Sequence, residues 1–322
     1  MKILITGAAG FIGSNLCEFF LKKGFTIIGL DNFATGFHNH IEEFGSYSNF
    51  SFMEGDIRNP EDCQKATQGV DVVLHQAALG SVPRSLNDPA TTNAVNISGF
   101  VNILEASRIH GVERVVYAAS SSTYGDSTKL PKVEHKIGNP LSPYAVTKYV
   151  NELYASVYAR SFGLKTIGLR YFNVFGRRQD PNGAYAAVIP KFVGKILKGE
   201  NPIINGDGSY SRDFTYIDNV LQMNYLAATT SNEKAFNQVY NTALGGRISI
   251  LEMTEQLIYG LQKLAPELSK VKIEFGPERL GDVPHSQASI DKAKKLLGYQ
   301  PTHNFTQGLE ASLEWYYKTL KQ

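Results

Sequence analysis

Short apolar runs rich in β-branched residues alternate with longer helical patterns along the first half of the chain, and this alternation most constrains its fold. The runs that read as strands span residues 2–6, 26–31, 50–56, 70–78, 113–121 and 165–176, with helical patterns at 13–23, 61–68, 90–110 and 144–162. Continuous apolar runs are typical of strands buried on both faces. The alternation therefore predicts an α/β fold with a doubly wound parallel sheet, whose ligands bind beyond the carboxyl ends of the strands.

The rhythm changes after about residue 176. The pattern there predicts helices at 190–199, 218–229 and 249–264, short strands at 202–205, 238–244 and 271–276, and a closing pair of helices. We divide the chain into residues 1–176 and a smaller α/β lobe, 177–322. Some segments of that lobe are expected to return to the first sheet.

Composition narrows the class of protein. The chain has 322 residues, of which 43% are hydrophobic and 19% charged, and a net charge of +2 with scattered basic residues. These values favour a soluble globular protein with neither a nucleic-acid nor a membrane partner, since no apolar run reaches the roughly 18 residues of a membrane span. Two cysteines and an N-terminus without signal-peptide features predict a cytoplasmic location. The histidines lack partners at ligand spacing, so we expect no metal site.

A glycine-rich turn follows the first strand. In "ITGAAGFIGSNL", Gly7 permits a tight turn, Gly10 permits close approach of the backbone to a pyrophosphate, and Gly13 permits close packing of helix on strand. Asp31 ends the second strand, where a carboxylate binds the adenosine ribose hydroxyls and repels a 2′-phosphate. The pattern predicts an NAD site. Asp56 has two interpretations, a contact to the adenine amino group or a helix N-cap.

A tyrosine and a lysine lie one helical turn apart in "SPYAVTK", at Tyr144 and Lys148. The same spacing recurs at Tyr317 and Lys321, and one chance occurrence is expected in a chain with 17 tyrosines. Only the first pair follows a serine-rich strand end, "AASSSTYGD". A hydroxyl, a phenol and an ammonium beside a nicotinamide have a coherent role. The positive charges lower the phenol pKa, so that the phenolate can take a proton from an alcohol as hydride leaves its carbon.

Together these motifs, with "HQAA", "LRYFNVFG", "INGDGSYSRDFTYIDN" and "ERLGDVPHS", resemble the extended short-chain dehydrogenase/reductase family nearly from end to end. The later motifs are similar to its nucleotide-sugar branch, above all the UDP-hexose 4-epimerases. The resemblance implies a Rossmann-like domain that binds NAD and a smaller lobe that binds a UDP-sugar. It also implies a homodimer formed through helices 90–110 and 144–162.

The resemblance assigns roles residue by residue. Tyr144 would be the base, Lys148 would hold the nicotinamide ribose, and Ser120 would be the catalytic hydroxyl, although the triple serine leaves Ser121 and Ser122 as alternatives. The expected cofactor contacts are Gly7, Gly10, Phe11, Ile12, Gly13, Asp31, Asn32, Gly36, Asp56, Ile57, Ala77, Ala78, Tyr144, Lys148 and Tyr171. The expected substrate contacts are Ser81, Arg84, Ser121, Ser122, Asn173, Ala187, Val188, Asn205, Arg212, Arg279, Asp282 and Ser286.

The residues also narrow the reaction. A 4,6-dehydratase of this family carries an Asp-Glu pair where this chain has Ser121 and Ser122, a decarboxylase a Glu in the same loop, and net reduction favours NADPH, against Asp31. A 4-epimerase remains. In this branch the position of Ser286 limits the pocket beside the sugar C2, and a small side chain there leaves room for an N-acetyl group.

We therefore predict interconversion of UDP-GlcNAc and UDP-GalNAc, with weaker activity on UDP-Glc and UDP-Gal. The alternatives are a UDP-glucuronate/UDP-galacturonate or other UDP-sugar 4-epimerase and, in another class, a non-catalytic dinucleotide-sensing protein. Such sensing proteins usually lack the tyrosine or the lysine.

Overall fold

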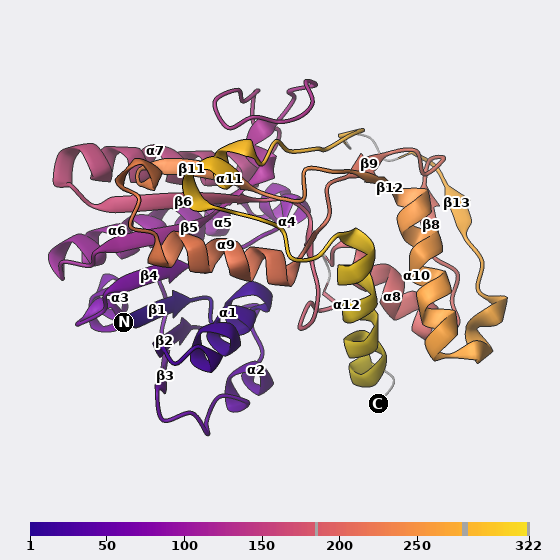
Figure 1. Cartoon of the computed structure of the whole chain (residues 1–322), viewed down its shortest axis with the longest axis horizontal. Helices are drawn as coiled ribbons and strands as arrows, with labels where there is room; N and C mark the ends of the chain where they lie inside the picture. Colours follow the sequence, from indigo (N-terminus) through magenta and orange to yellow (C-terminus); the bar gives the residue numbers. More distant parts are fainter. Residues whose placement is uncertain (184–185, 279–282, 321–322) are drawn as a thin grey trace.

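A seven-stranded parallel sheet organises the computed structural model, which describes residues 1–183, 186–278 and 283–320 (Figure 1). The strand order is β11-β6-β5-β4-β1-β2-β3. The strands are β1 (Lys2–Thr6), β2 (Thr26–Asp31), β3 (Phe50–Glu54), β4 (Val72–His75), β5 (Arg114–Ser120), β6 (Lys165–Tyr171) and β11 (Gln238–Thr242). The predicted α/β fold with a doubly wound parallel sheet is confirmed. The order reverses between β1 and β4, and in such sheets ligands bind at this switch point.

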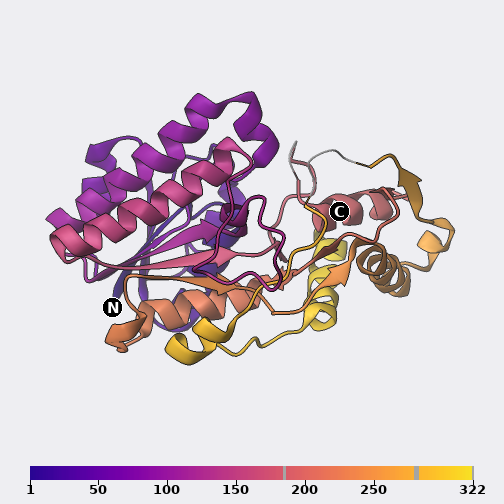
Figure 2. The ribbon, with the colours of Figure 1, turned by 90° about the horizontal axis from the view of Figure 1, so that it is seen from above.

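Helices cover both faces of the sheet. Those on one face are α3 (Pro60–Thr67), α6 (Gly99–Ile109) and α7 (Pro143–Phe162), whereas α1 (Phe11–Lys22) and α9 (Ile217–Thr229) pack on the other. Figure 2 shows the orange α9 across the sheet from the magenta α7. Side chains alternate along each strand, so Ile3 and Ile5 join the core with α1 and α9 while Leu4 joins the core with α6 and α7. Both faces are therefore buried, as the continuous apolar strands predict.

The predicted helix at 90–110 is interrupted. The structure has α5 (Pro89–Asn93), then a π-helical segment (Ala94–Ser98), then α6. Within that segment the buried Asn96 holds the backbone of Leu79, accepting from its N–H at 2.8 Å and donating to its carbonyl at 3.2 Å. The wider turn coincides with this inward contact, and π-segments inside α-helices are frequent at functional sites.

The smaller lobe contains three packed helices, α8 (Val188–Leu197), α10 (Ile250–Leu264) and α12 (Phe305–Leu320). Beside them β8 (Ile203–Asn205) pairs with β13 (Glu274–Gly276), and β9 (Ser211–Arg212) pairs with β12 (Ile248–Ser249). A third pair joins β7 (Val174–Phe175) to β10 (Thr215–Tyr216). The other α-helices of the described residues are α2 (His38–Glu42), α4 (Val82–Asn87) and α11 (Asp291–Leu297), and short 3₁₀ segments span Ser121–Tyr124, Glu233–Ala235 and Pro266–Lys270.

The second half of the chain contributes to both parts of the molecule. Strand β11 forms the edge of the large sheet beside β6, α9 packs beneath β4, β5 and β6, and α11 contacts β11 (Figure 1). The sheet thus contains a strand from residues beyond 176. Within the described residues, no helix is long and apolar enough to cross a bilayer.

Candidate active site

The turn after β1 brings backbone against backbone. Gly7 has φ +69°, and a Cβ on Gly13 would lie 2.0 Å from the Gly7 carbonyl oxygen, so α1 can approach β1 only with glycine there. Gly10 is the N-cap residue of α1, and a Cβ on it would meet only that same oxygen, at 3.2 Å. Gly13 is therefore required for packing, whereas Gly10 leaves open space in front of the helix N-terminus.

Asp31 connects this turn to β2. One carboxylate oxygen accepts the Ala9 N–H at 2.9 Å and the other accepts the Phe33 N–H at 2.8 Å. Burial raises the pKa of Asp31, and these backbone hydrogen bonds oppose the shift. Gly36 packs on Ala9 as well, since a Cβ there would lie 2.7 Å from the Ala9 Cβ. Asp31 thus shapes the glycine turn in addition to any contact with a ribose.

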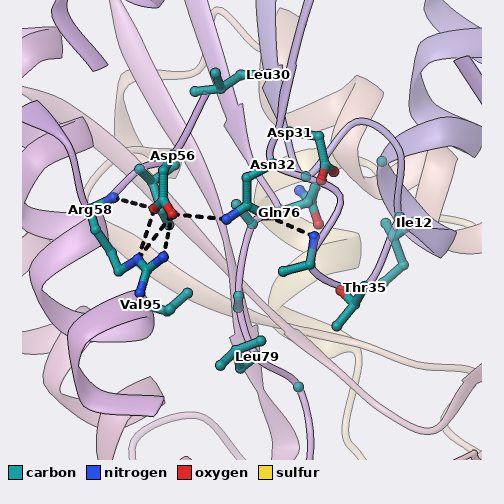
Figure 3. A pocket seen from close by; sticks show the side chains of 18 of the residues that line it. Ile12, Leu30, Asp31, Asn32, Thr35, Asp56, Arg58, Gln76, Leu79 and Val95 are labelled. Atoms are coloured by element: carbon teal, nitrogen blue, oxygen red, sulfur yellow. Dashed lines mark hydrogen bonds and ion pairs between the residues drawn. The ribbon is translucent and has the colours of Figure 1, made fainter. Parts of the chain in front are cut away.

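A cavity of about 360 Å³ opens at the switch point of the sheet (Figure 3). The cofactor residues predicted from the sequence that line it are Gly7, Gly10, Phe11, Ile12, Gly13, Asp31, Asn32, Asp56, Ile57, Ala77 and Ala78. Four others predicted for the cofactor, Gly36, Tyr144, Lys148 and Tyr171, are not part of its lining. Lining residues that we did not predict include Thr35, Arg58, Gln76 and Leu79.

Asp56 is not a helix cap. The residue that caps α3 is Asn59, whose side chain accepts the Glu61 N–H. The Asp56 carboxylate instead accepts from the Arg58 guanidinium at 2.6–3.0 Å and from Asn32 at 2.9 Å (Figure 3). The hydrogen bonds of Arg58 lower the pKa of Asp56 to about 2, so this wall of the cavity carries a fixed carboxylate.

Tyr144 lies in the first turn of α7. Ser142 caps this helix by accepting the Ala145 N–H at 3.1 Å, and Pro143 occupies the first turn, where its fixed φ suits a helix start. Burial raises the pKa of the Tyr144 phenol, and a hydrogen bond with Ser120 opposes the shift. The groups of the chain itself therefore raise the phenol pKa. The lowering predicted from the sequence depends on the nicotinamide charge as well as on Lys148, and it stays a prediction.

Lys148 lies one turn further along α7. Its ammonium donates to the Ala118 carbonyl on β5 at 2.8 Å, and burial lowers its pKa to about 8. This hydrogen bond goes to a neutral backbone oxygen. Lys148 is therefore held at the carboxyl end of β5, the same strand end that carries the serine hydroxyls.

The three serines take distinct positions. Ser120 ends β5 and accepts hydrogen bonds from the Ser122 N–H at 3.1 Å and from the Ser122 hydroxyl at 2.9 Å. Ser121 and Ser122 begin a 3₁₀ turn that runs to Tyr124. Of the three hydroxyls, Ser120 is the one whose hydrogen bond affects the Tyr144 phenol, which favours it among the alternatives that the sequence leaves open.

The residues predicted for the substrate lie in both parts of the molecule. Ser81 caps α4 by accepting the Arg84 N–H, and Ala187 is the N-cap residue of α8, which begins at Val188. Asn205 ends β8, and the Ser286 N–H donates to the Ser211 carbonyl. Asn173 donates to the Asp213 carbonyl at 3.2 Å and has φ +37°. Arg212 donates to the Pro284 carbonyl at 3.0 Å and lines a second cavity, of about 590 Å³. Arg279 and Asp282 lie outside the described residues.

Two buried polar residues, which the sequence pattern does not indicate, connect the first turn of α7 to the wall of the cofactor cavity. Asn96 donates to the Thr147 hydroxyl at 3.1 Å, and Thr147 donates to the Tyr144 carbonyl at 2.8 Å. Because Asn96 also holds Leu79 of the cofactor cavity, the first turn of α7 is tied to the cavity wall. The sequence offers one signal for such a contact, which is that "HQAALG" lies at the end of a predicted strand.

A match to a family model accounts for this combination of cavity and polar groups. Residues 3–243 match the NAD dependent epimerase/dehydratase family. The chain belongs to this family. Its cofactor is NAD, and the space that the glycines leave in front of α1, with Asp31 at the end of β2, fits that dinucleotide. The described residues contain no cluster of His, Cys, Asp or Glu that could hold a metal ion.

Relatives with different named substrates resemble the chain equally well. A putative UDP-glucose 4-epimerase of Methanocaldococcus jannaschii is 35% identical over 97% of each chain. A solved UDP-N-acetylglucosamine 4-epimerase from Methanobrevibacter ruminantium, in complex with UDP-N-acetylmuramic acid, is 34% identical over 98% of each chain, with a TM-score of 0.91. A solved UDP-glucuronic acid 4-epimerase from Bacillus cereus, with UDP-glucuronic acid and NAD, is 33% identical over 99% of each chain, with a TM-score of 0.88.

We predict that Gly10→Ala weakens NAD binding about tenfold or more, corresponding to roughly 1.4 kcal/mol, while the melting temperature stays near that of the wild type. The new methyl group would lie 3.2 Å from the Gly7 carbonyl oxygen, a tight contact that a shift of a few tenths of an ångström relieves, and it occupies space that the pyrophosphate needs. Calorimetric titration with NAD measures the effect. Gly246→Ala, at a glycine with open space around it, is the matched control. Equal NAD affinity in the two variants would contradict the placement of the pyrophosphate.

Proposed function

We propose that the chain is an NAD-dependent UDP-sugar 4-epimerase that interconverts UDP-GlcNAc and UDP-GalNAc. The observation that carries this proposal is the grouping of Ser120, Tyr144 and Lys148 at the carboxyl end of β5, tied to the NAD cavity through Asn96. The relatives support 4-epimerisation, since proteins named for three such activities match the chain along its length.

In the proposed mechanism Tyr144 takes the proton of the sugar 4-hydroxyl and later returns it. Bound in the cavity, NAD would supply the acceptor and donor of the C4 hydride. Inversion at C4 requires that the hydride return to the opposite face of the 4-keto sugar, so that the reaction has no net redox change. The hydrogen bond with Ser120 stabilises the phenolate form against the cost of burial. Ser120 also orients the reacting oxygen of the sugar, because its hydroxyl is held by Ser122.

Lys148 contributes a cation beside this group. Because its pKa is lowered to about 8, it is mostly protonated at neutral pH, and its fixed bond to Ala118 leaves further N–H donors for the nicotinamide ribose. The proposed lobe 177–322 supplies the substrate side, where Arg212 and Arg279 bind the diphosphate, Asn205 the uracil, and Asp282 the uridine ribose. These assignments rest on the family resemblance.

We expect the purified protein with NAD to convert UDP-GlcNAc to its C4 epimer without net change in the NADH absorbance. Tyr144→Phe removes the proton acceptor and should lower kcat at least a hundredfold, since general base catalysis contributes about 10²–10⁴. Chromatographic separation of the two epimers measures the conversion. Full activity of Tyr144→Phe would contradict the assigned base. Faster turnover of UDP-glucuronate than of UDP-GlcNAc would favour the uronic acid 4-epimerase.

The side chain of Ser286 supports the preference for N-acetylated sugars. It is half-buried beside Ser211 and adds little volume. We predict that Ser286→Tyr lowers kcat/KM for UDP-GlcNAc about tenfold or more relative to UDP-Glc, because a bulky ring would fill the space for the acetamido group. Parallel assays of both substrates test this, with Ser286→Ala as the control. An unchanged ratio would refute the gating role.

An apolar face on α7 supports the proposed homodimer. Val146, Leu153, Tyr154 and Val157 are 39–49% exposed and recur at helical spacing. We predict that the wild type is a dimer and that Leu153→Glu, which places a charge at the centre of this face, makes it monomeric. Sedimentation equilibrium distinguishes the two states. As a control, Tyr259→Glu, at an exposed aromatic residue of α10, should leave the dimer intact. A monomeric wild type would contradict the proposed homodimer.

A further inference from the structure

Three side chains from distant parts of the sequence form a closed ring of hydrogen bonds beneath the active site. The Asn224 amide donates to the Tyr171 hydroxyl at 2.9 Å, the Tyr171 hydroxyl donates to the Gln76 carbonyl oxygen at 3.0 Å, and the Gln76 amide donates to the Asn224 carbonyl oxygen at 3.3 Å. Each residue donates once and accepts once within the ring. The ring therefore closes with a single direction of hydrogen bonding.

The ring cannot easily reverse its direction. Asn224 is fully buried, and its amide nitrogen also donates to the Val220 carbonyl of its own helix at 2.9 Å. This bond fixes which end of the Asn224 amide faces Tyr171. Burial raises the pKa of Tyr171 far above its ordinary value, so its hydroxyl keeps the proton that it donates to Gln76.

The ring lies where the reacting groups meet. Gln76 lines the NAD cavity (Figure 3) and directly follows β4, whereas Tyr171 ends β6 in register with Ser120. Strand β5 runs between β4 and β6, so the two side chains flank the strand that carries Ser120. Asn224 reaches both of them from α9, which packs beneath these strands.

We propose that Asn224 is a positioning residue, which fixes Gln76 and Tyr171 so that the NAD in the cavity is held in register with Ser120 and Tyr144. Without Asn224 the Gln76 amide loses the partner of its nitrogen and the Tyr171 hydroxyl loses its donor. The Gln76 side chain could then rotate in the cavity wall, and Tyr171, which does not line the cavity, would no longer hold it in place. The consequence for turnover rests on the proposed epimerase function, whereas the consequence for NAD binding does not.

An isosteric change tests the direction of the ring. In Asn224→Asp a carboxylate oxygen faces the Tyr171 hydroxyl and must accept its proton, so that the Gln76 carbonyl oxygen loses its donor. Flipping the Gln76 amide restores that contact but turns its oxygen toward the second carboxylate oxygen. While the carboxyl is ionised, no arrangement satisfies all three groups. When it is protonated it has one O–H donor where the amide nitrogen supplies two, so it cannot serve both Tyr171 and the Val220 carbonyl. Either way a buried polar group loses its partner, which is costly.

Asn219→Asp is the matched control. Asn219 is a fully buried asparagine on the same helix, but its side chain binds the backbone of Thr302 and His303, away from the ring. The same substitution there also removes a buried amide donor. It should lower the melting temperature without affecting the NAD cavity.

The deciding experiment is a fluorescence titration of each cofactor-depleted variant with NADH, followed by kcat for UDP-GlcNAc at saturating NAD. We expect Asn224→Asp to raise the dissociation constant of NADH about tenfold and to lower kcat at least as much. Asn219→Asp should stay within about twofold of the wild type in both measurements. If the wild type epimerises no UDP-sugar, the NADH titration still decides the role of the ring.

Two outcomes would overturn the proposal. One is an NADH dissociation constant for Asn224→Asp within twofold of that for Asn219→Asp, and the other is a normal kcat at saturating NAD in a wild type that is active. A double-mutant cycle of Asn224→Leu and Tyr171→Phe provides a separate test. The two changes should be strongly non-additive in NADH affinity, because either one already opens the ring, and additive effects would show that the residues act independently.

Discussion

The contact between the Gly13 backbone and the Gly7 carbonyl determines how the rest of the site is built. A methyl group at Gly13 would lie 2.0 Å from that oxygen, so the absence of a side chain sets the distance between β1 and α1. The helix N-terminus is thereby fixed beyond the end of β1, where its free N–H groups face the cavity. Asp31 then connects the same turn to β2 through the Ala9 N–H. The dinucleotide site thus arises from backbone packing, with few side chains needed to shape it.

The catalytic helix is positioned by a different kind of interaction. Tyr144, Lys148 and Glu152 recur at one-turn intervals and therefore share a face of α7. Glu152 forms a buried bidentate ion pair with Arg170 of β6, with nitrogen–oxygen distances of 2.8 and 2.7 Å. Arg170 lies next to Tyr171 at the end of its strand. The ion pair therefore fixes the rotation of the whole face relative to the sheet, and the phenol and the ammonium follow from it.

Much of this arrangement is visible in the sequence because local patterns determine it. Five of the six strands of the first half lie where their apolar runs predict them. The sixth, predicted at 165–176, is wrong in its second part, because β6 ends at Tyr171 and β7 pairs with β10 outside the large sheet, after the positive φ of Asn173. The glycines that line the cavity are recognisable from the chemistry of a tight turn beside a pyrophosphate. Long-range partners were not recognisable. Gln76 and Asn224 are 148 residues apart, and nothing in the pattern around either residue indicates the other. The same holds for the π-segment at Asn96 and for Arg58, whose ion pair with Asp56 neither interpretation of that carboxylate included.

The smaller lobe is connected to the sheet by buried polar contacts as well as by chain connectivity. The carboxylate of Asp213 accepts the N–H groups of Leu244, Gly245 and Ala288, while its own carbonyl accepts from Asn173. Leu244 follows β11 of the large sheet closely, and Asn173 follows β6. One buried residue between these two strand ends therefore places Arg212, its neighbour in sequence, relative to the sheet. A substrate bound by that lobe would keep a defined position relative to Tyr144. The lobe is anchored at the ends of β6 and β11, and the helix that carries Tyr144 is anchored at the end of the neighbouring β5.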